Sequence, residues 1–129
     1  MALNVHIVTP TAAVFSGEAS SVRIQGWEGE FEVLEGHDIL LALLRGGLTV
    51  VTTPSGVKRF VTGRGFVEVG PNSVNVLTDS CEPAGSADKD AARDALKASD
   101  ATKLGTTMGS PAWDTAEEQA ELAHARLSA

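Results

Sequence analysis

The large β-branched and aromatic side chains of this sequence are confined to its first part, and this separation constrains the fold more than any other feature. All thirteen valines and all three isoleucines lie before residue 77, and all four phenylalanines lie before residue 67. The 45 residues from Gly85 onward contain twelve alanines and no valine, isoleucine or phenylalanine. Because β-branched side chains favour strands and alanine is the best helix former, the sequence predicts a β domain over residues 1–84 and a helical segment over residues 85–129.

Short apolar runs recur at regular intervals in the first part. In the first run Leu3, Val5 and Ile7 occupy alternate positions, which is typical of a strand with one face on a core. Turn sequences such as Pro54-Ser55-Gly56 and Gly70-Pro71-Asn72 separate later runs. The predicted strands cover residues 3–9, 19–25, 30–34, 48–53, 57–62, 66–69 and 73–78. Many short strands separated by turns predict an antiparallel β-sandwich rather than βαβ units.

The run at residues 39–44 is ambiguous. It is apolar on both faces, and it is shorter than a helix usually is. We interpret it as a strand buried on both faces or as a tight segment between two sheets.

Two helices are predicted in the C-terminal segment, joined by a polar connection between Gly105 and Gly109. Ser86 is a candidate cap for the first helix, and the second is expected to begin near Asp114 or Thr115. Small side chains recur three or four residues apart and form one stripe on each helix. These stripes are Ala87, Ala91, Ala95 and Ala98 in the first helix and Ala116, Ala120, Ala123 and Leu127 in the second. Because methyl groups bury little area, we expect an antiparallel two-helix hairpin that is weakly held on the β domain.

Charge and cysteine content exclude several classes of protein. The net charge is −7, with 5 basic and 9 acidic residues up to residue 84 and 5 and 8 beyond it, so neither part suits a nucleic acid or an anionic membrane surface. No apolar run reaches the roughly 20 residues of a membrane span, and we expect a soluble chain without a secretion signal. The single cysteine, Cys81, rules out an internal disulfide and indicates a reducing compartment.

Catalytic, metal and cofactor sites are not expected. The sequence contains no nucleophile-elbow, zinc-helix or phosphate-loop motif. His37 and Asp38 are adjacent, so in a strand their side chains would point to opposite faces and could not act as a pair. Gly63-Arg64-Gly65 is interpreted as a strand bend.

Several motifs, in their order along the chain, resemble those of the ε subunit of F-type ATP synthases. They are a first strand that ends at Pro10, Phe15-Ser16-Gly17, Glu28-Gly29-Glu30 before a strand, Gly36-His37 before an apolar run, Gly-Phe-Val-Glu-Val at residues 65–69, a turn at Asn72 and Val-Asn-Val-Leu-Thr-Asp at residues 74–79. The resemblance extends over most of the chain, and it rests on the order and spacing of these motifs together.

This resemblance implies a non-catalytic rotor subunit that couples proton flow through a ring of c subunits to ATP synthesis in the catalytic head. The β domain would pack against the γ subunit of the central stalk and rest on the c-ring, and the hairpin would contact the α and β subunits of the head. The chain would be a peripheral component on the cytoplasmic face of the bacterial inner membrane. Glu30 and His37 fall where the family contacts the polar loops of the c-ring, and their acceptor and donor groups suit such contacts. Alternatively, His37 only closes the turn after Gly36.

Two features of the helical segment concern regulation. Asp90 and Arg93 partly match a nucleotide-binding motif on the first C-terminal helix of some bacterial members, but at i and i+3 they also make a surface ion pair without any ligand. In many relatives the second helix continues further and carries basic residues that insert into the head and block hydrolysis. Here it offers Arg126 and His124 against three glutamates, so we expect weak inhibition.

A rival hypothesis is a free-standing β-sandwich module that binds a small ligand or a carbohydrate. Such a module would be a monomer with an aromatic-lined groove. The chain has no tyrosine, four phenylalanines and two tryptophans, so it is poorly supplied for such a groove. The rotor-subunit hypothesis is therefore preferred.

Overall fold

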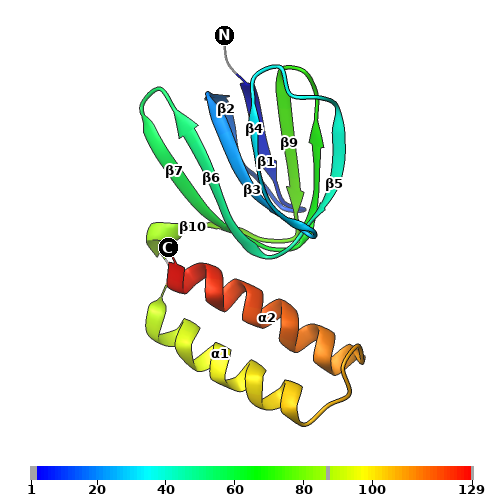
Figure 1. Ribbon diagram of the computed structural model, residues 1–129. Helices are drawn as coiled ribbons and strands as arrows, with labels where there is room; N and C mark the ends of the chain where they lie inside the picture. Colours follow the sequence, from blue (N-terminus) through cyan, green and yellow to red (C-terminus); the bar gives the residue numbers. More distant parts are fainter. Residues whose placement is uncertain (1–2, 87, 129) are drawn as a thin grey trace.

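The computed structural model describes residues 3–86 and 88–128, which form ten strands, one short 3-10 helix and two α-helices (Figure 1). The strands are β1 (Leu3–Val8), β2 (Ala13–Ala19), β3 (Ser21–Gly26), β4 (Gly29–Leu34), β5 (Leu40–Leu44), β6 (Gly47–Thr53), β7 (Gly56–Thr62), β8 (Gly65–Val69), β9 (Ser73–Thr78) and β10 (Cys81–Pro83). The helices are η1 (Ala84–Ser86), α1 (Lys89–Leu104) and α2 (Pro111–Ser128).

The strands belong to one hydrogen-bonded sheet that folds over on itself as a sandwich (Figure 1). Their order is β10-β7-β6-β3-β5-β8-β9-β1-β2, and β4 pairs with β3 outside this path. The described pairs are antiparallel except β1 with β9, which run parallel with Val5 opposite Val74. The predicted sandwich is confirmed, with one parallel pair that the local turn sequences did not indicate.

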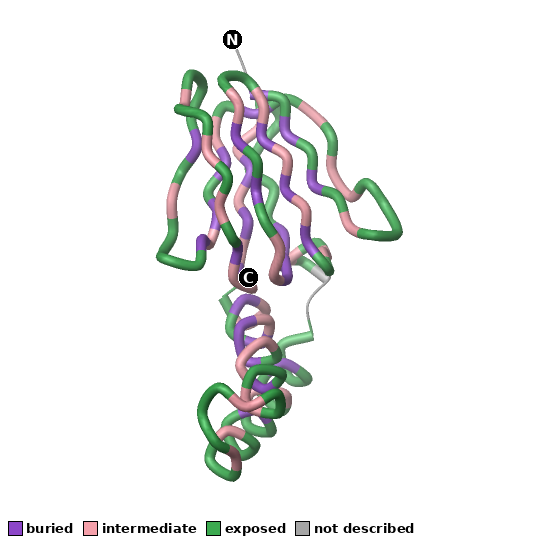
Figure 2. Tube along the Cα trace, turned by 90° about the vertical axis from the view of Figure 1, so that its right-hand side faces the viewer, coloured by how far each residue is buried: buried purple, intermediate pink, exposed green. Residues whose placement is uncertain are grey.

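The core of the sandwich consists of side chains from alternate strand positions. In β1, Leu3, Val5 and Ile7 are fully buried, whereas the residues between them are exposed. Figure 2 shows the same alternation of buried and more exposed positions along the neighbouring strands. Burying one such side chain contributes about 1.5–3 kcal/mol, so the confinement of valine and isoleucine to the first part decides where the core forms. The remaining core members are Ala19, Val22, Ile24, Val33, Leu44, Val51, Phe60, Val67, Val69, Val74 and Val76.

The ambiguous apolar run forms β5, but only one of its faces is covered. Leu44 is buried and Leu40 and Ala42 are half-buried, whereas Leu41 and Leu43 are 69% and 66% exposed. The expectation of a strand buried on both faces, or of a segment between two sheets, was therefore wrong. The sandwich covers only the inner face of β5, and no second layer of the described chain lies on the outer face.

Two strands, β2 and β10, were not predicted from the sequence. β2 contains Ser16 and Gly17, which have little preference for strands, and β10 has only three residues. They form the two ends of the strand order and pair with β1 and β7 respectively. Their conformation is therefore decided by the edge that each one extends rather than by local sequence.

Both helices begin at residues other than those expected. Asp88, not Ser86, caps α1, and its carboxylate accepts a hydrogen bond from the N–H of Ala91 at 3.0 Å. α2 begins earlier than predicted, at Pro111, because proline is favoured at the first helical position, where no N–H is needed. The hydroxyl of Ser110 accepts a hydrogen bond from the N–H of Trp113 at 3.3 Å and so satisfies the first turn of α2.

The stripe predicted for α2 is confirmed for its three alanines, whereas its fourth member, Leu127, is only half-buried. The stripe predicted for α1 is not confirmed. The buried alanines of the α2 stripe are Ala116, Ala120 and Ala123. In α1, Ala91 and Ala98 are exposed, and the buried residues are Ala92 and Ser99, each one position further along the helix. Ala87 lies outside the described residues. Alanine spacing alone allows several faces of α1 to be buried, and contact with α2 selects one of them.

The hairpin meets the sandwich through α2. This helix lies between the sandwich and α1 (Figure 1), and it contacts β6 and β7. None of the helices in the described ranges is long and apolar enough to cross a membrane. The residues that α2 presents to the sandwich therefore decide how the hairpin is attached.

Candidate functional site

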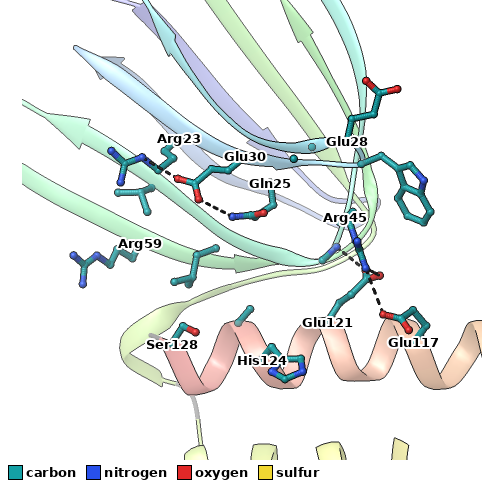
Figure 3. Close-up of a pocket in the computed structure, with 17 residues that line it drawn as sticks. Arg23, Gln25, Glu28, Glu30, Arg45, Arg59, Glu117, Glu121, His124 and Ser128 are labelled. Atoms are coloured by element: carbon teal, nitrogen blue, oxygen red, sulfur yellow. Dashed lines mark hydrogen bonds and ion pairs between the residues drawn. The ribbon is translucent and has the colours of Figure 1, made fainter. Parts of the chain in front are cut away.

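Glu30 and His37 lie at opposite ends of β4. The Glu30 carboxylate is 3.1 Å from Arg23 Nε and accepts a hydrogen bond from Gln25 Nε2 at 3.0 Å, and it lines a cleft of about 740 Å³ between the sandwich and α2 (Figure 3). His37 follows β4, with Nδ1 2.7 Å from the backbone oxygen of Asp38. The structure does not bring the two residues into one compact site. A surface that contains both has to extend along β4, whose described pairing is with β3 alone.

Asp90 and Arg93 form an ion pair on the exposed side of α1. Arg93 Nη1 lies 2.7 Å from Asp90 Oδ1, and the Asp90 side chain is 92% exposed. The surface pair that the i, i+3 spacing offered is therefore present. It satisfies both side chains without a ligand, and a role in nucleotide binding stays a prediction.

The acidic side of α2 is bound to arginines of the sandwich. Glu121 accepts two hydrogen bonds from Arg64, from Nε at 3.1 Å and from Nη2 at 2.9 Å, and a third from Arg45 Nη2 at 3.2 Å. The backbone N–H of Gly46 donates a fourth at 2.8 Å. Arg45 Nη2 also lies 3.4 Å from Glu117, whose other oxygen is 2.6 Å from Lys103 Nζ in α1. Figure 3 shows Arg45 between the two glutamates at the foot of the sandwich.

The environment of Glu121 favours its charged form. Burial alone would raise the pKa of this carboxyl, but hydrogen bonds from Arg64 and from the Gly46 N–H outweigh burial and hold the pKa below its usual value of 4.5. The same hydrogen bond raises the pKa of Arg64. Proton release by Glu121 and contact of α2 with the sandwich are therefore linked.

The pKa of Glu118 is shifted in the opposite direction from that of Glu121. Burial, followed by a hydrogen bond and charge repulsion with Asp79 in the β9–β10 connection, raises the pKa of Glu118 above 4.5. Two carboxyl groups in contact cannot both ionise without repulsion. Glu118 therefore favours contact between α2 and the sandwich only when the pair holds a proton.

Contact between α2 and the sandwich is expected to be strongest in mildly acidic solution and to weaken on both sides. The Glu121 contribution is present above pH 4.5 and is lost as the pH falls through its lowered pKa, whereas the Glu118 contribution is present below pH 4.5 and is lost as the pH rises through its raised pKa. The measurement is the NMR chemical shift of the Gly46 amide proton from about pH 3 to about pH 8. A single titration step in one direction would contradict the expectation.

The pairing of Arg45 and Arg64 with α2 was missed in the sequence. Gly63-Arg64-Gly65 was interpreted as a strand bend, and residues 63–64 do join β7 to β8. The glutamates of α2 were interpreted as charges that oppose insertion into the catalytic head, and not as partners of these arginines. The sequence feature that could have indicated this pairing is one arginine in each of two glycine-containing turns, Arg45-Gly46-Gly47 and Gly63-Arg64-Gly65.

An apolar strip crosses the outer face of four neighbouring strands. Leu43 lies opposite Phe66, Phe66 lies opposite Leu77, and Leu77 lies opposite Val8. Leu43 is 66% exposed, Phe66 37% and Val8 36%, and Leu41 extends the strip along β5. A cavity of about 460 Å³ opens at its end between Val8, Phe66 and Leu77. We call these five residues the apolar strip, because contiguous exposed apolar side chains typically mark a protein interface.

A family model described as "ATP synthase, Delta/Epsilon chain, beta-sandwich domain" matches residues 2–84. The chain belongs to this family. The ATP synthase epsilon chain of Bordetella avium is 37% identical over 122 residues, which cover 94% of this chain and 84% of that relative. The epsilon chain of a Hydrogenobaculum species is 36% identical over 86 residues, which cover 67% of this chain and 62% of that relative. The chain thus spans most of one relative and less than two thirds of the other.

Two solved structures share the fold. A chain of the Euglena gracilis mitochondrial ATP synthase superposes with a TM-score of 0.83 at 20% identity. The superposition covers 95% of this chain and 78% of the Euglena chain. A chain of the Tetrahymena thermophila mitochondrial ATP synthase central stalk and c-ring superposes with a TM-score of 0.65 at 15% identity. This superposition covers 97% of this chain and 96% of the Tetrahymena chain. At these identities the likeness concerns the fold alone. The ε-subunit resemblance is confirmed by the family match, so this ε-family chain is a non-catalytic subunit of an ATP synthase and not a free-standing ligand-binding module.

Proposed function

We propose that this ε-family chain acts as a rotor subunit of the central stalk, which couples proton flow through the c-ring to ATP synthesis in the catalytic head. The observation that carries the proposal is a close-packed sandwich with an apolar strip on one outer face. A close-packed β core resists deformation and can pass torque between two partners as a rigid wedge. The similarity to epsilon chains of bacterial ATP synthases supports a place on the cytoplasmic face of the inner membrane, as a peripheral component.

The apolar strip is the surface proposed for the γ subunit. It joins β5, β8, β9 and β1 in register, so a partner that covers it gains contacts with four strands at once. Leu41 and Leu43 are the most exposed members of the strip, and burying a leucine contributes about 1.5–3 kcal/mol. A permanent partner within the stalk would cover these exposed leucines.

The β4 strand is the surface proposed for the polar loops of the c-ring. Glu30 retains 47% exposure of its side chain while it contacts Arg23, and His37 stands in the turn at the other end of the strand. Because the two residues are separated by the length of β4, each would meet a different loop of the ring. Contact at two separated points resists rotation of the sandwich against the ring better than contact at one point.

The division between residues 1–84 and 85–129 is proposed to separate a coupling unit from a regulatory unit that reaches the α and β subunits. We expect weak inhibition by the hairpin, because the glutamates of α2 that face the sandwich would repel acidic segments of the head. ATP hydrolysis by the reconstituted complex, with and without residues 85–129, measures this inhibition. Many-fold activation on removal would contradict it. Nucleotide binding at Asp90 and Arg93 can be tested by comparing nucleotide binding of the chain with and without residues 85–129.

The rotor role is tested by co-purification with γ and the catalytic head, and by the coupling of ATP hydrolysis to proton pumping. Unmodified chain is expected to join the complex and to support coupling. The double variant Glu30→Ala, His37→Ala is expected to join equally well and to pump at least about twofold less per ATP, because two polar contacts to the ring are lost.

The matched control for this double variant is Glu18→Ala, which removes an exposed carboxylate from β2, outside both β4 and the apolar strip. Its coupling is expected to equal that of the unmodified chain. A chain that never joins the complex would overturn the rotor role. A double variant with full coupling would overturn the β4 contact while leaving the rotor role standing.

A further inference from the structure

The four hydrogen bonds to Glu121 come from groups that belong to the sandwich alone. Arg45 and Gly46 form the turn between β5 and β6, and Arg64 lies in the bend between β7 and β8. Both turns contact α2 through Glu121, and Figure 3 shows Arg45 of the first turn beside that residue. The planar guanidinium of Arg64 binds both carboxylate oxygens, which is the strongest geometry available for this pair. The Glu121 side chain keeps only 5% of its exposure there.

A residue of the sandwich also contacts both arginines. Trp27 lies beside both guanidinium groups, with its ring centre 5.4 Å from Arg45 Cζ and 5.1 Å from Arg64 Cζ. Arginine stacks favourably on an aromatic face. Trp27 thus gives the two cations, which repel each other, a shared contact within the sandwich in addition to their contacts with α2.

Gly46 leaves room for the incoming carboxylate. A Cβ atom at this position would lie 2.9 Å from Glu121 Cβ and 3.2 Å from Glu121 Oε1. The absence of a side chain thus lets the backbone N–H approach the carboxylate to 2.8 Å. The β5–β6 turn supplies the fixed N–H donor, the open approach and Arg45, and the β7–β8 bend supplies Arg64. Together these groups can bind a carboxylate.

The rest of the contact between α2 and the sandwich is thin. The buried apolar residues of α2 are alanines, whose methyl groups bury little area. The other ion pairs described for this contact are Arg45 with Glu117 at 3.4 Å and Arg126 with Glu82 at 2.6 Å. Both are partly exposed, and such pairs contribute little in water. Glu121 is therefore the residue of α2 that carries most of the specificity of docking.

We propose that Arg45, Arg64 and the Gly46 N–H form a carboxylate-binding site on the sandwich, which Glu121 occupies as an intramolecular ligand and which an acidic helical segment of a partner protein occupies when the hairpin leaves. The ligand class follows from the charge of the site and from the ligand that it holds, a glutamate presented by a helix. The hairpin and the acidic partner segment then compete for one site. Binding of either one excludes the other.

The intramolecular half of the proposal is tested in the full chain by fluorescence energy transfer between dyes at Val57→Cys and Met108→Cys, in a Cys81→Ser background. Both labelled positions are exposed. Glu121→Gln is expected to raise the ratio of undocked to docked hairpin at least about tenfold, since a buried charge-assisted network is lost. Asp100→Asn makes the same chemical change on the exposed side of α1 and is expected to leave the ratio unchanged.

Gly46→Ala provides a second variant that keeps every charge. Its methyl group would lie 2.9 Å from Glu121 Cβ and force that side chain away from the Gly46 N–H, so the hairpin is expected to undock as it does in Glu121→Gln. Arg64→Gln combined with Glu121→Gln is expected to add little to either single change, because both remove the same contact. A docked hairpin in both Glu121→Gln and Gly46→Ala would overturn the proposal.

The intermolecular half uses a labelled peptide with the sequence of residues 111–128 as the acidic helical probe. This peptide is expected to bind the Glu121→Gln chain at least about tenfold more tightly than the unmodified chain, whose site is already occupied. The same peptide with glutamine at the position of Glu121 is expected not to bind, and neither is the original peptide to a chain that also carries Arg64→Gln. Equal binding to all chains would overturn the site. These measurements use the isolated chain and do not depend on the rotor role.

Discussion

Replacing Gly65 with alanine is expected to lower the free energy of unfolding of the sandwich by about 3 kcal/mol or more. Gly65 begins β8 and pairs with Leu44 of β5 on one side and with Thr78 of β9 on the other. A Cβ atom there would lie 1.9 Å from the backbone oxygen of Leu77 and 2.8 Å from Thr78 Cα. Both obstacles are main-chain atoms of a paired strand, so relief requires β8 and β9 to separate.

The loss is measured as the shift of the urea midpoint of the full chain, followed by far-ultraviolet circular dichroism. Domains of this size have a total stability of about 5–15 kcal/mol, so a loss of this size is a large share of it. Gly17→Ala is the matched control in β2, where the added Cβ would meet the ring of Phe15, with Cζ nearest at 3.4 Å. Its expected effect is within about 0.5 kcal/mol. An unchanged midpoint for Gly65→Ala would show that β9 can move aside.

Replacing Leu43 and Phe66 together with aspartate is expected to weaken association with γ by at least about 100-fold. The two side chains lie opposite each other at the centre of the apolar strip. Truncation of a central interface residue commonly costs about 2 kcal/mol or more, and a buried unpaired carboxylate adds a desolvation cost. The double variant should remain folded, because both residues point away from the core and Leu43 is 66% exposed.

The measurement is the dissociation constant of the chain and purified γ, together with circular dichroism to show that the variant is folded. Val57→Asp is the matched control, since Val57 is a 57% exposed valine at the start of β7, outside the apolar strip. It is expected to bind γ as the unmodified chain does. Equal weakening by Val57→Asp and by the double variant would mean that total charge, and not the apolar strip, governs association. Normal binding by the double variant would place γ on another face.

The sequence predicted which face of α2 is buried, but it did not predict which face of α1 is buried. The stripe of Ala116, Ala120 and Ala123 predicted a helix that packs closely through small side chains, and these residues are buried. The same spacing misled the assignment in α1, where the buried face is shifted by one residue to Ala92 and Ser99. A stripe of methyl groups provides too little difference in burial energy between adjacent faces to decide which of them faces a neighbour.

β5 illustrates a second limit. Its apolar pattern on both faces is the same whether the outer face is covered by the chain itself or by a partner, because the hydrophobic effect does not depend on which molecule supplies the cover. Leu41 and Leu43 were therefore assigned to the interior of this chain, and the structure leaves them exposed. The proposed cover is the γ subunit, which the sequence of one chain does not contain.

The sequence by itself determined the class of fold, the place of the core and the family. Valine and isoleucine end at residue 76 and alanine dominates after residue 85, so strand preference and helix preference divide the chain without any knowledge of contacts. Only the tertiary structure decided which charges meet. Arg45, Arg64 and Glu121 belong to two turns and a helix that are far apart in the chain, and whether such charges attract depends on distance and burial, which appear only after the sheet has folded and α2 has docked.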